Sequence, residues 1–94
     1  MKLDLGKELL GLDGKPVMDG DKPLLMSKFV AGLLAAGQTD DAVKFMDWAL
    51  KLYNEGSIEI DESDKEKLLA FLNENKTMTN LAKGAIMKTV KAAA

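Results

Sequence analysis

The segment TDDAVKFMDWALKLYNEG, residues 39–56, has the most regular apolar pattern in the chain and decides the fold. Its apolar residues recur every three or four positions, which is the spacing of one face of an α-helix. Thr39 is suited to cap this helix, and Asp40 and Asp41 would lie at the positive end of its dipole. Gly56 would end it. The segment therefore predicts a long helix in the middle of a mainly helical protein.

The apolar side of this helix is unusually wide. On a helical wheel it covers more than half of the circumference, which is more than a surface helix of a globular protein needs. The helix is therefore either central in the fold or in contact with a second apolar partner. Its stripe and flanks consist of Ala42, Met46, Ala49 and Tyr53, with Val43 and Leu50 on one side and Phe45 and Leu52 on the other.

Trp48 lies at the edge of this apolar arc. A tryptophan at such a position usually packs in the core, but tryptophan is also strongly enriched in protein contacts. Two interpretations of Phe45, Trp48 and Leu52 therefore stay open. In the first, they belong to the core. In the second, they form the surface that binds a protein partner or a second copy, and on this interpretation they are the predicted partner-binding residues of the helix.

Three further helices are expected from capping signals followed by apolar periodicity. The expected helices are 24–36, with Pro23 in its first turn; 64–73, after the capping box of Ser63 and Glu66; and 80–91, after the cap Thr79. The side chains expected to face inward are Leu25, Phe29, Val30 and Leu33, then Leu68, Leu69 and Leu72, then Leu81, Ala82, Ala85, Ile86 and Val90.

A small β element completes the predicted fold. Residues 1–5 alternate apolar and polar side chains, as a half-buried strand does, and residues 57–60 are a brief strand that could pair with them. Asp13-Gly14 between apolar flanks predicts a hairpin, and Asp19-Gly20 would end its return arm. The fold class is mainly α (α+β), with about four helices packed on an N-terminal β-hairpin or short sheet. We expect one domain over 1–94, with the hairpin in 1–20 and the helical part in 23–92.

The composition leaves few residue types for catalysis. Among 94 residues there is no Cys and no His, and all thirteen basic residues are Lys. The usual general base, the commonest metal ligands and the forked guanidinium that grips phosphate are therefore absent. We predict no catalytic, cofactor-binding or metal-binding residue, and a protein that is not an enzyme. No signal peptide or membrane span is visible, which favours the cytoplasm.

The stretch GLDGKPVMDGDKP, residues 11–23, contains two Asp-Gly pairs and two Lys-Pro pairs, so we compare it with metal-binding and phosphate-binding loops. Neither aspartate frame places oxygen ligands and glycine at the spacing of a calcium-binding EF-hand loop. The stretch also lacks the glycine-lysine pattern of a phosphate loop, and its aspartates would repel an anion. We therefore interpret it as a pair of turns. The acidic run 59–64 is likewise interpreted as stabilising a helix N-terminus rather than as a cation site.

Charge is unevenly distributed along the second half of the chain. Residues 55–75 carry a net charge of −5 and residues 76–94 a net charge of +4, within a total of −2. Lys83, Lys88 and Lys91 fall outside the apolar stripe of the last expected helix. They are candidate partner-binding residues, for example for a nucleotide, or they suit the dipole of that helix and its acidic neighbour. The negative total makes nucleic acid an unlikely partner.

The order of these features resembles small accessory proteins of tailed bacteriophages and prophages. The resemblance lies in LDGKPVMDGDKPL leading into a helix, then DWALKLYNEGSIEID, then LAFLNENKTMTNLAKGAIMK. Some small helical phage proteins of this type are tail-assembly chaperones, and this similarity implies contact with apolar segments of another protein in the host cytoplasm. It carries over no site residue.

Three functions are compatible with these observations. The first is a non-enzymatic protein-binding accessory protein of phage origin, acting in virion or tail assembly through apolar surface around residues 39–56. The second is an inhibitor or decoy of a host defence protein, which would use the acidic stretch 55–66. The third is a small-ligand binder that holds nucleotides with the three lysines of the last helix.

Overall fold

The structure is a computed structural model that describes residues 1–93. Within these residues it contains four helices and four short strands, so the predicted mainly helical α+β class is confirmed. The elements are β1 (Lys2–Asp4), β2 (Met18–Asp19), β3 (Lys22–Pro23), α1 (Met26–Ala36), α2 (Ala42–Glu55), β4 (Ser57–Glu59), α3 (Glu62–Glu74) and α4 (Asn80–Ala92).

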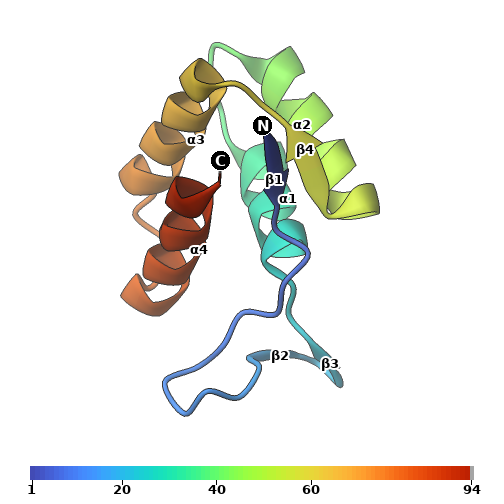
Figure 1. The fold of residues 1–94 in the computed structure, drawn as a ribbon, viewed down its shortest axis with the longest axis vertical. Helices are drawn as coiled ribbons and strands as arrows, with labels where there is room; N and C mark the ends of the chain where they lie inside the picture. Colours follow the sequence, from blue (N-terminus) through green and yellow to red (C-terminus); the bar gives the residue numbers. More distant parts are fainter. Residues whose placement is uncertain (94) are drawn as a thin grey trace.

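The helices form two antiparallel pairs. Figure 1 shows α1 and α2 on one side of the molecule, α3 and α4 on the other, and β1 between them. β1 pairs antiparallel with β4, with Leu3 opposite Ile58, so the predicted pairing of the N-terminal strand with residues 57–60 is confirmed. Both of these side chains are buried, and the strand pair therefore forms part of the core between the two helix pairs.

The predicted hairpin has a different turn. Asp13-Gly14 makes a turn closed by a bridge from Leu10 to Pro16, without a strand ladder. The ladder forms one turn later, where β2 and β3 pair around a two-residue turn of Gly20 and Asp21. Gly20 has a φ of +68°, which suits the first central position of a type II′ turn. Residues 10–23 thus form an arm that extends below the helices (Figure 1).

The predicted starts of the first two helices are wrong. Pro23 belongs to β3, and α1 begins only at Met26, because the Leu24 N–H donates to the Val17 carbonyl and keeps the chain extended. α2 begins at Ala42 after Asp41, and Thr39 does not cap it. Gly56 ends α2 as predicted, in the left-handed region at φ +79°, where glycine is favoured.

The second helix pair follows its predicted capping more closely. α4 is capped by Thr79, whose hydroxyl accepts a hydrogen bond from the Ala82 N–H at 3.2 Å, as expected. α3 begins two residues earlier than predicted, because Asp61 rather than Ser63 is the cap. The Asp61 carboxylate accepts from the Asp64 N–H at 2.8 Å, and aspartate is among the best residues for this position.

Lysines at the starts of α3 and α4 cap the ends of the opposite helix. The Lys65 ammonium donates to the carbonyls of Lys91 and Ala93 at the C-terminus of α4, at 3.0 and 2.9 Å. The Lys83 ammonium donates to the Asn73 carbonyl at 3.1 Å and to that of Asn75, at the C-terminus of α3. Each helix thereby supplies a cation to the negative end of its neighbour's dipole.

Candidate functional site

The structure places the predicted contact residues of α2 in the core. Phe45, Trp48 and Leu52 are 4%, 5% and 0% exposed. The Phe45 ring stacks on Trp48 with centroids 5.2 Å apart and meets the edge of Phe71 from α3 at 5.3 Å. The prediction that these three side chains form a binding surface is therefore wrong, and their alternative interpretation as core is correct. The physical reason is that Phe45 and Trp48 stack on each other and Phe45 packs against Phe71 of α3, so this side of the helix faces the second helix pair.

The opposite edge of the wide apolar arc is exposed. Its four large side chains follow each other along α2 at spacings of three, four and three residues, and we call them the outer face of α2. The outer face consists of Val43, Met46, Leu50 and Tyr53, which are 88%, 41%, 56% and 58% exposed. The arc was thus predicted with the correct width, but the helix is rotated so that the outer face, not the aromatic side, meets solvent.

α1 borders the outer face and deepens it into a shallow groove. A hollow of about 210 Å³ lies between the two helices, and its floor on the α1 side is made by the small residues Ala31, Gly32 and Ala35. The ammonium of Lys28 lies 4.7 Å from the centre of the Tyr53 ring at one end of the groove, within the range of a cation–π interaction. The groove is therefore apolar along its length with one positive charge at its end.

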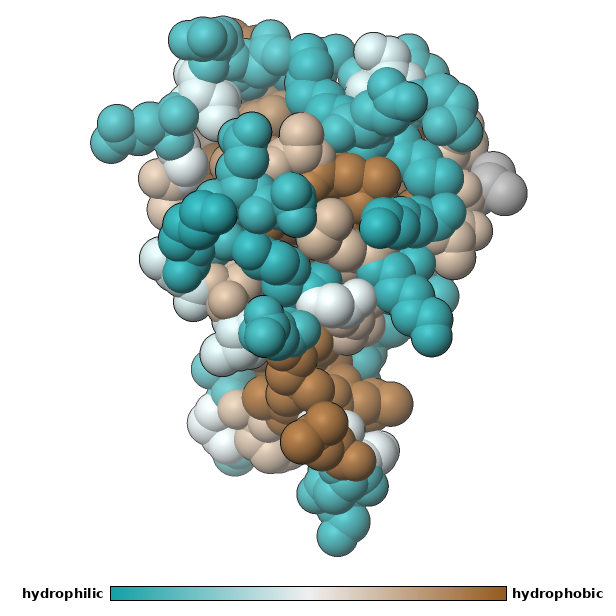
Figure 2. All heavy atoms as spheres, turned by 90° about the vertical axis from the view of Figure 1, so that its left-hand side faces the viewer, coloured by the Kyte–Doolittle hydropathy of each residue, from teal (hydrophilic) through white to brown (hydrophobic). Residues whose placement is uncertain are grey.

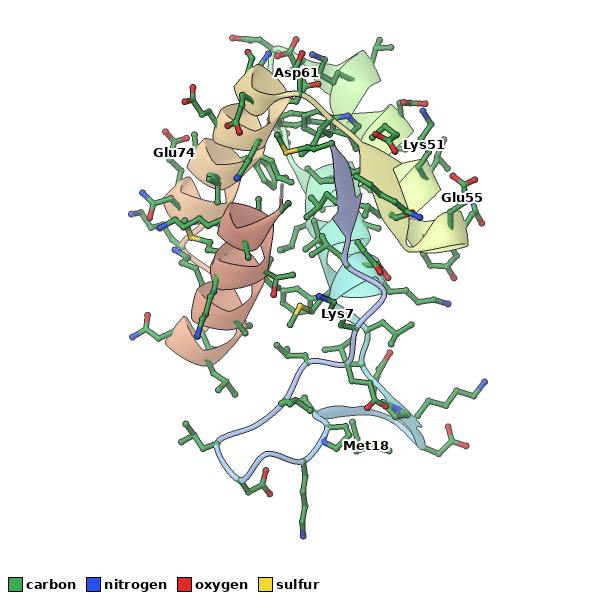
Figure 3. All side chains as sticks on the ribbon, in the orientation of Figure 1. Lys7, Met18, Lys51, Glu55, Asp61 and Glu74 are labelled. Atoms are coloured by element: carbon green, nitrogen blue, oxygen red, sulfur yellow. The ribbon has the colours of Figure 1, made fainter. Side chains whose placement is uncertain are left out.

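A second exposed apolar surface lies on the arm. Leu10, Leu12 and Met18 are 47%, 97% and 53% exposed. Figure 2 shows hydrophobic side chains gathered on the arm, below a largely hydrophilic surface of α3 and α4, and Figure 3 shows Met18 far from the helices. The sequence predicted the turns of this arm, but it gave no signal that the leucines beside them would stay uncovered.

The predicted lysine cluster is brought together, but its members differ. Lys83, Lys88 and Lys91 line one open groove of about 580 Å³ together with Asn73, Asn80, Gly84 and Met87. The ammonium of Lys83 is held by the carbonyls at the end of α3, which is a capping role. Lys88 and Lys91 lie on the exposed side of α4. Three point charges without a guanidinium give this groove little geometric selectivity for an anion.

The acidic residues near the start of α3 are used in the fold. Asp61 caps α3, and Asp64 pairs with Lys44 of α2 at 2.8 Å. The hydrogen bond between them lowers the pKa of the Asp64 carboxyl, and it raises the pKa of the Lys44 ammonium. Asp41, just before α2, pairs with Lys67 of α3, which lowers the pKa of the aspartate. These pairs join α2 to α3, and they leave fewer of the acids for a partner.

The interpretation of residues 11–23 as turns is confirmed by the backbone. Gly14 and Gly20 both have positive φ values, and Asp13 accepts a hydrogen bond from the Lys15 N–H at 3.0 Å. Across residues 1–93, no three carboxylate side chains gather closely enough to hold a metal ion. In the same part of the chain, no helix has both the length and the apolar character needed to cross a bilayer.

Comparison of the chain with protein-family models, with curated proteins and with solved structures finds no match. Of the exposed surfaces of residues 1–93, the outer face of α2 has the most regular arrangement of apolar side chains.

Proposed function

We propose that this chain is a non-enzymatic accessory protein that acts by binding protein through the outer face of α2. The observation that carries the proposal is the exposure of Val43, Met46, Leu50 and Tyr53 in one continuous helical stripe. Burial of a large apolar side chain stabilises a complex by about 1.5–3 kcal/mol relative to exposure. A contiguous apolar stripe on a small protein marks an interaction site more often than isolated exposed residues do.

The more specific part of the proposal is a role in virion or tail assembly of a tailed bacteriophage, in the host cytoplasm. It is supported by the sequence resemblance to small phage accessory proteins and by the apolar character of both exposed surfaces. An assembly helper holds apolar segments of another protein until they are incorporated, so it needs uncovered apolar surface rather than a catalytic cleft. The arm would give such a helper a second point of contact.

Co-expression of the tagged chain with the genes that flank its own tests the proposal. We expect a phage virion or tail protein to co-purify with the wild-type chain, and Leu50→Lys on the outer face to reduce its recovery strongly. Lys88→Ala, on the opposite side of the molecule, is the matched control and should leave recovery unchanged. Co-purification that Leu50→Lys does not affect would contradict the use of this face.

A further inference from the structure

The outer face of α2 has a pattern that fits a second copy of itself. Its side chains recur at spacings of three, four and three residues, which is the a-d-a-d spacing of helices that pair side by side. The pattern is also symmetric about Trp48. Val43 and Tyr53 lie five residues before and after it, and Met46 and Leu50 lie two residues before and after it.

We propose that two copies of the chain associate through the outer faces of α2, which run antiparallel about a two-fold axis near the level of Trp48. This inference rests on the proposed function, since it concerns the same face, which the second copy covers when no phage protein is bound there. A two-fold axis brings each residue opposite its symmetry counterpart. Val43 of one copy therefore packs against Tyr53 of the other, and Met46 against Leu50. Each contact occurs twice, and no apolar member of the stripe is left over.

Charges beside the outer face are complementary under the same symmetry. Asp47 and Lys51 form an ion pair at 3.1 Å on the edge away from α1, and Figure 3 shows Lys51 on the side of α2 away from α3 and α4. The midpoint of this pair lies within about one residue of Trp48. The antiparallel arrangement therefore places the Asp47 carboxylate near the Lys51 ammonium of the other copy. The two pairs form a neutral cluster at the centre of one edge.

The other edge of the outer face allows the α1 helices to approach each other. Gly32 is exposed in the middle of α1, and a Cβ atom at this position would meet no atom within 4 Å. Ala35 lies one turn further along and is also exposed. Because the symmetry places both α1 helices on the same edge, these small residues face each other. The result is a four-helix contact made of α1 and α2 from each copy.

The expected association is reversible. Each copy contributes only one face each of α1 and α2, which have 11 and 14 residues, to the contact, whereas stable interfaces of standard size involve about 20–30 residues on each partner. We expect the mass measured by light scattering to rise from 10.2 kDa toward twice that value as the concentration increases into the micromolar range. A strict monomer throughout this range would overturn the proposal.

Substitutions on the face test the contact and its charges. Leu50→Lys should raise the dissociation constant at least ~100-fold, because it acts at two symmetric positions. Leu12→Lys, the same change on the arm, is the control and should leave it unchanged. Asp47→Lys should weaken association about tenfold, and the exchange D47K/K51D should restore it. A dissociation constant that stays raised in the double variant would refute the charge arrangement. Circular dichroism checks that each variant is folded.

Cysteine cross-linking tests the direction of the helices, since the chain has no cysteine of its own. A mixture of the variants V43C and Tyr53→Cys should form the mixed disulfide in preference to either symmetric one. Efficient self-linking of V43C would indicate a parallel pair and overturn the proposal. A strict monomer that still loses phage-protein binding on Leu50→Lys would refute dimerisation while leaving the proposed function intact.

Discussion

Two leucines on α2, separated by one residue, provide a sharp test of how the helix is rotated. Leu52 is fully buried, whereas Leu50 is 56% exposed on the outer face. Leu→Ala at a buried position costs about 2–5 kcal/mol, because apolar contacts are lost and a cavity remains. We expect about 3 kcal/mol for Leu52→Ala. The same substitution at an exposed position changes stability by about 0.5 kcal/mol or less, which is our expectation for Leu50→Ala.

Urea denaturation followed by circular dichroism measures both free energies of unfolding. For a domain of 94 residues, a loss of about 3 kcal/mol lowers the melting temperature by roughly 12–24 °C. Measurements at several protein concentrations separate this effect from any loss of self-association, because stability that comes from association depends on concentration. Equal losses for the two variants at the lowest concentration, or a larger loss for Leu50→Ala, would show that the assigned rotation of α2 is wrong.

Three further predictions concern turns, caps and pH. Gly32→Ala should stabilise the monomer by about 0.5–1 kcal/mol, because the added Cβ atom lies inside a helix and meets no other atom. Gly56→Ala should destabilise the monomer by roughly 1–2 kcal/mol, because φ at this position is +79°. Thermal melts compare the two variants. Asp61→Ala should cost about 1 kcal/mol in urea denaturation, and Asp61→Asn, which keeps the cap, much less. Lys44 lowers the pKa of Asp64 below the ordinary 3.8, so this pair stabilises the fold above that pH and the contribution is lost as the pH falls below it. Asp64→Asn should therefore flatten the acid limb of the stability curve, and an unchanged limb would contradict the assignment.

Local signals in the sequence predicted the elements of the fold well. Residues 1–93 contain four helices in the expected order, the pairing of the first strand with residues 57–60, and the cap Thr79 of α4. These features depend on apolar spacing and on capping chemistry within a few residues, which the sequence displays directly. The predicted start of α1 was wrong because strand pairing with the preceding segment, rather than capping chemistry, decides it. Pro23 stays extended because Val17 accepts the hydrogen bond of the next residue, which no local pattern reveals.

The candidate site depended on information that periodicity does not contain. The width of the apolar arc on α2 predicted that some of its side chains would stay exposed to solvent, but a helical wheel does not show which of them these are. Packing against the other helix pair decides this choice, because the Phe45 ring lies between Trp48, on which it stacks, and Phe71 of α3. The smaller Val43 and Leu50 are then turned outward.

The charge segregation of the second half of the chain has a structural explanation in the antiparallel packing of α3 and α4. Each helix carries, three residues after its first, a lysine that reaches the carbonyl end of the other: Lys65 in α3 and Lys83 in α4. Aspartates at the start of α3 meanwhile cap it and pair with α2. Charges engaged in this way stabilise the helix pair and contribute less to binding of a host defence protein or a nucleotide. The uncovered apolar side chains have no such structural use, and for this reason the proposed function is assigned to the outer face of α2 rather than to the acidic stretch or the lysine groove.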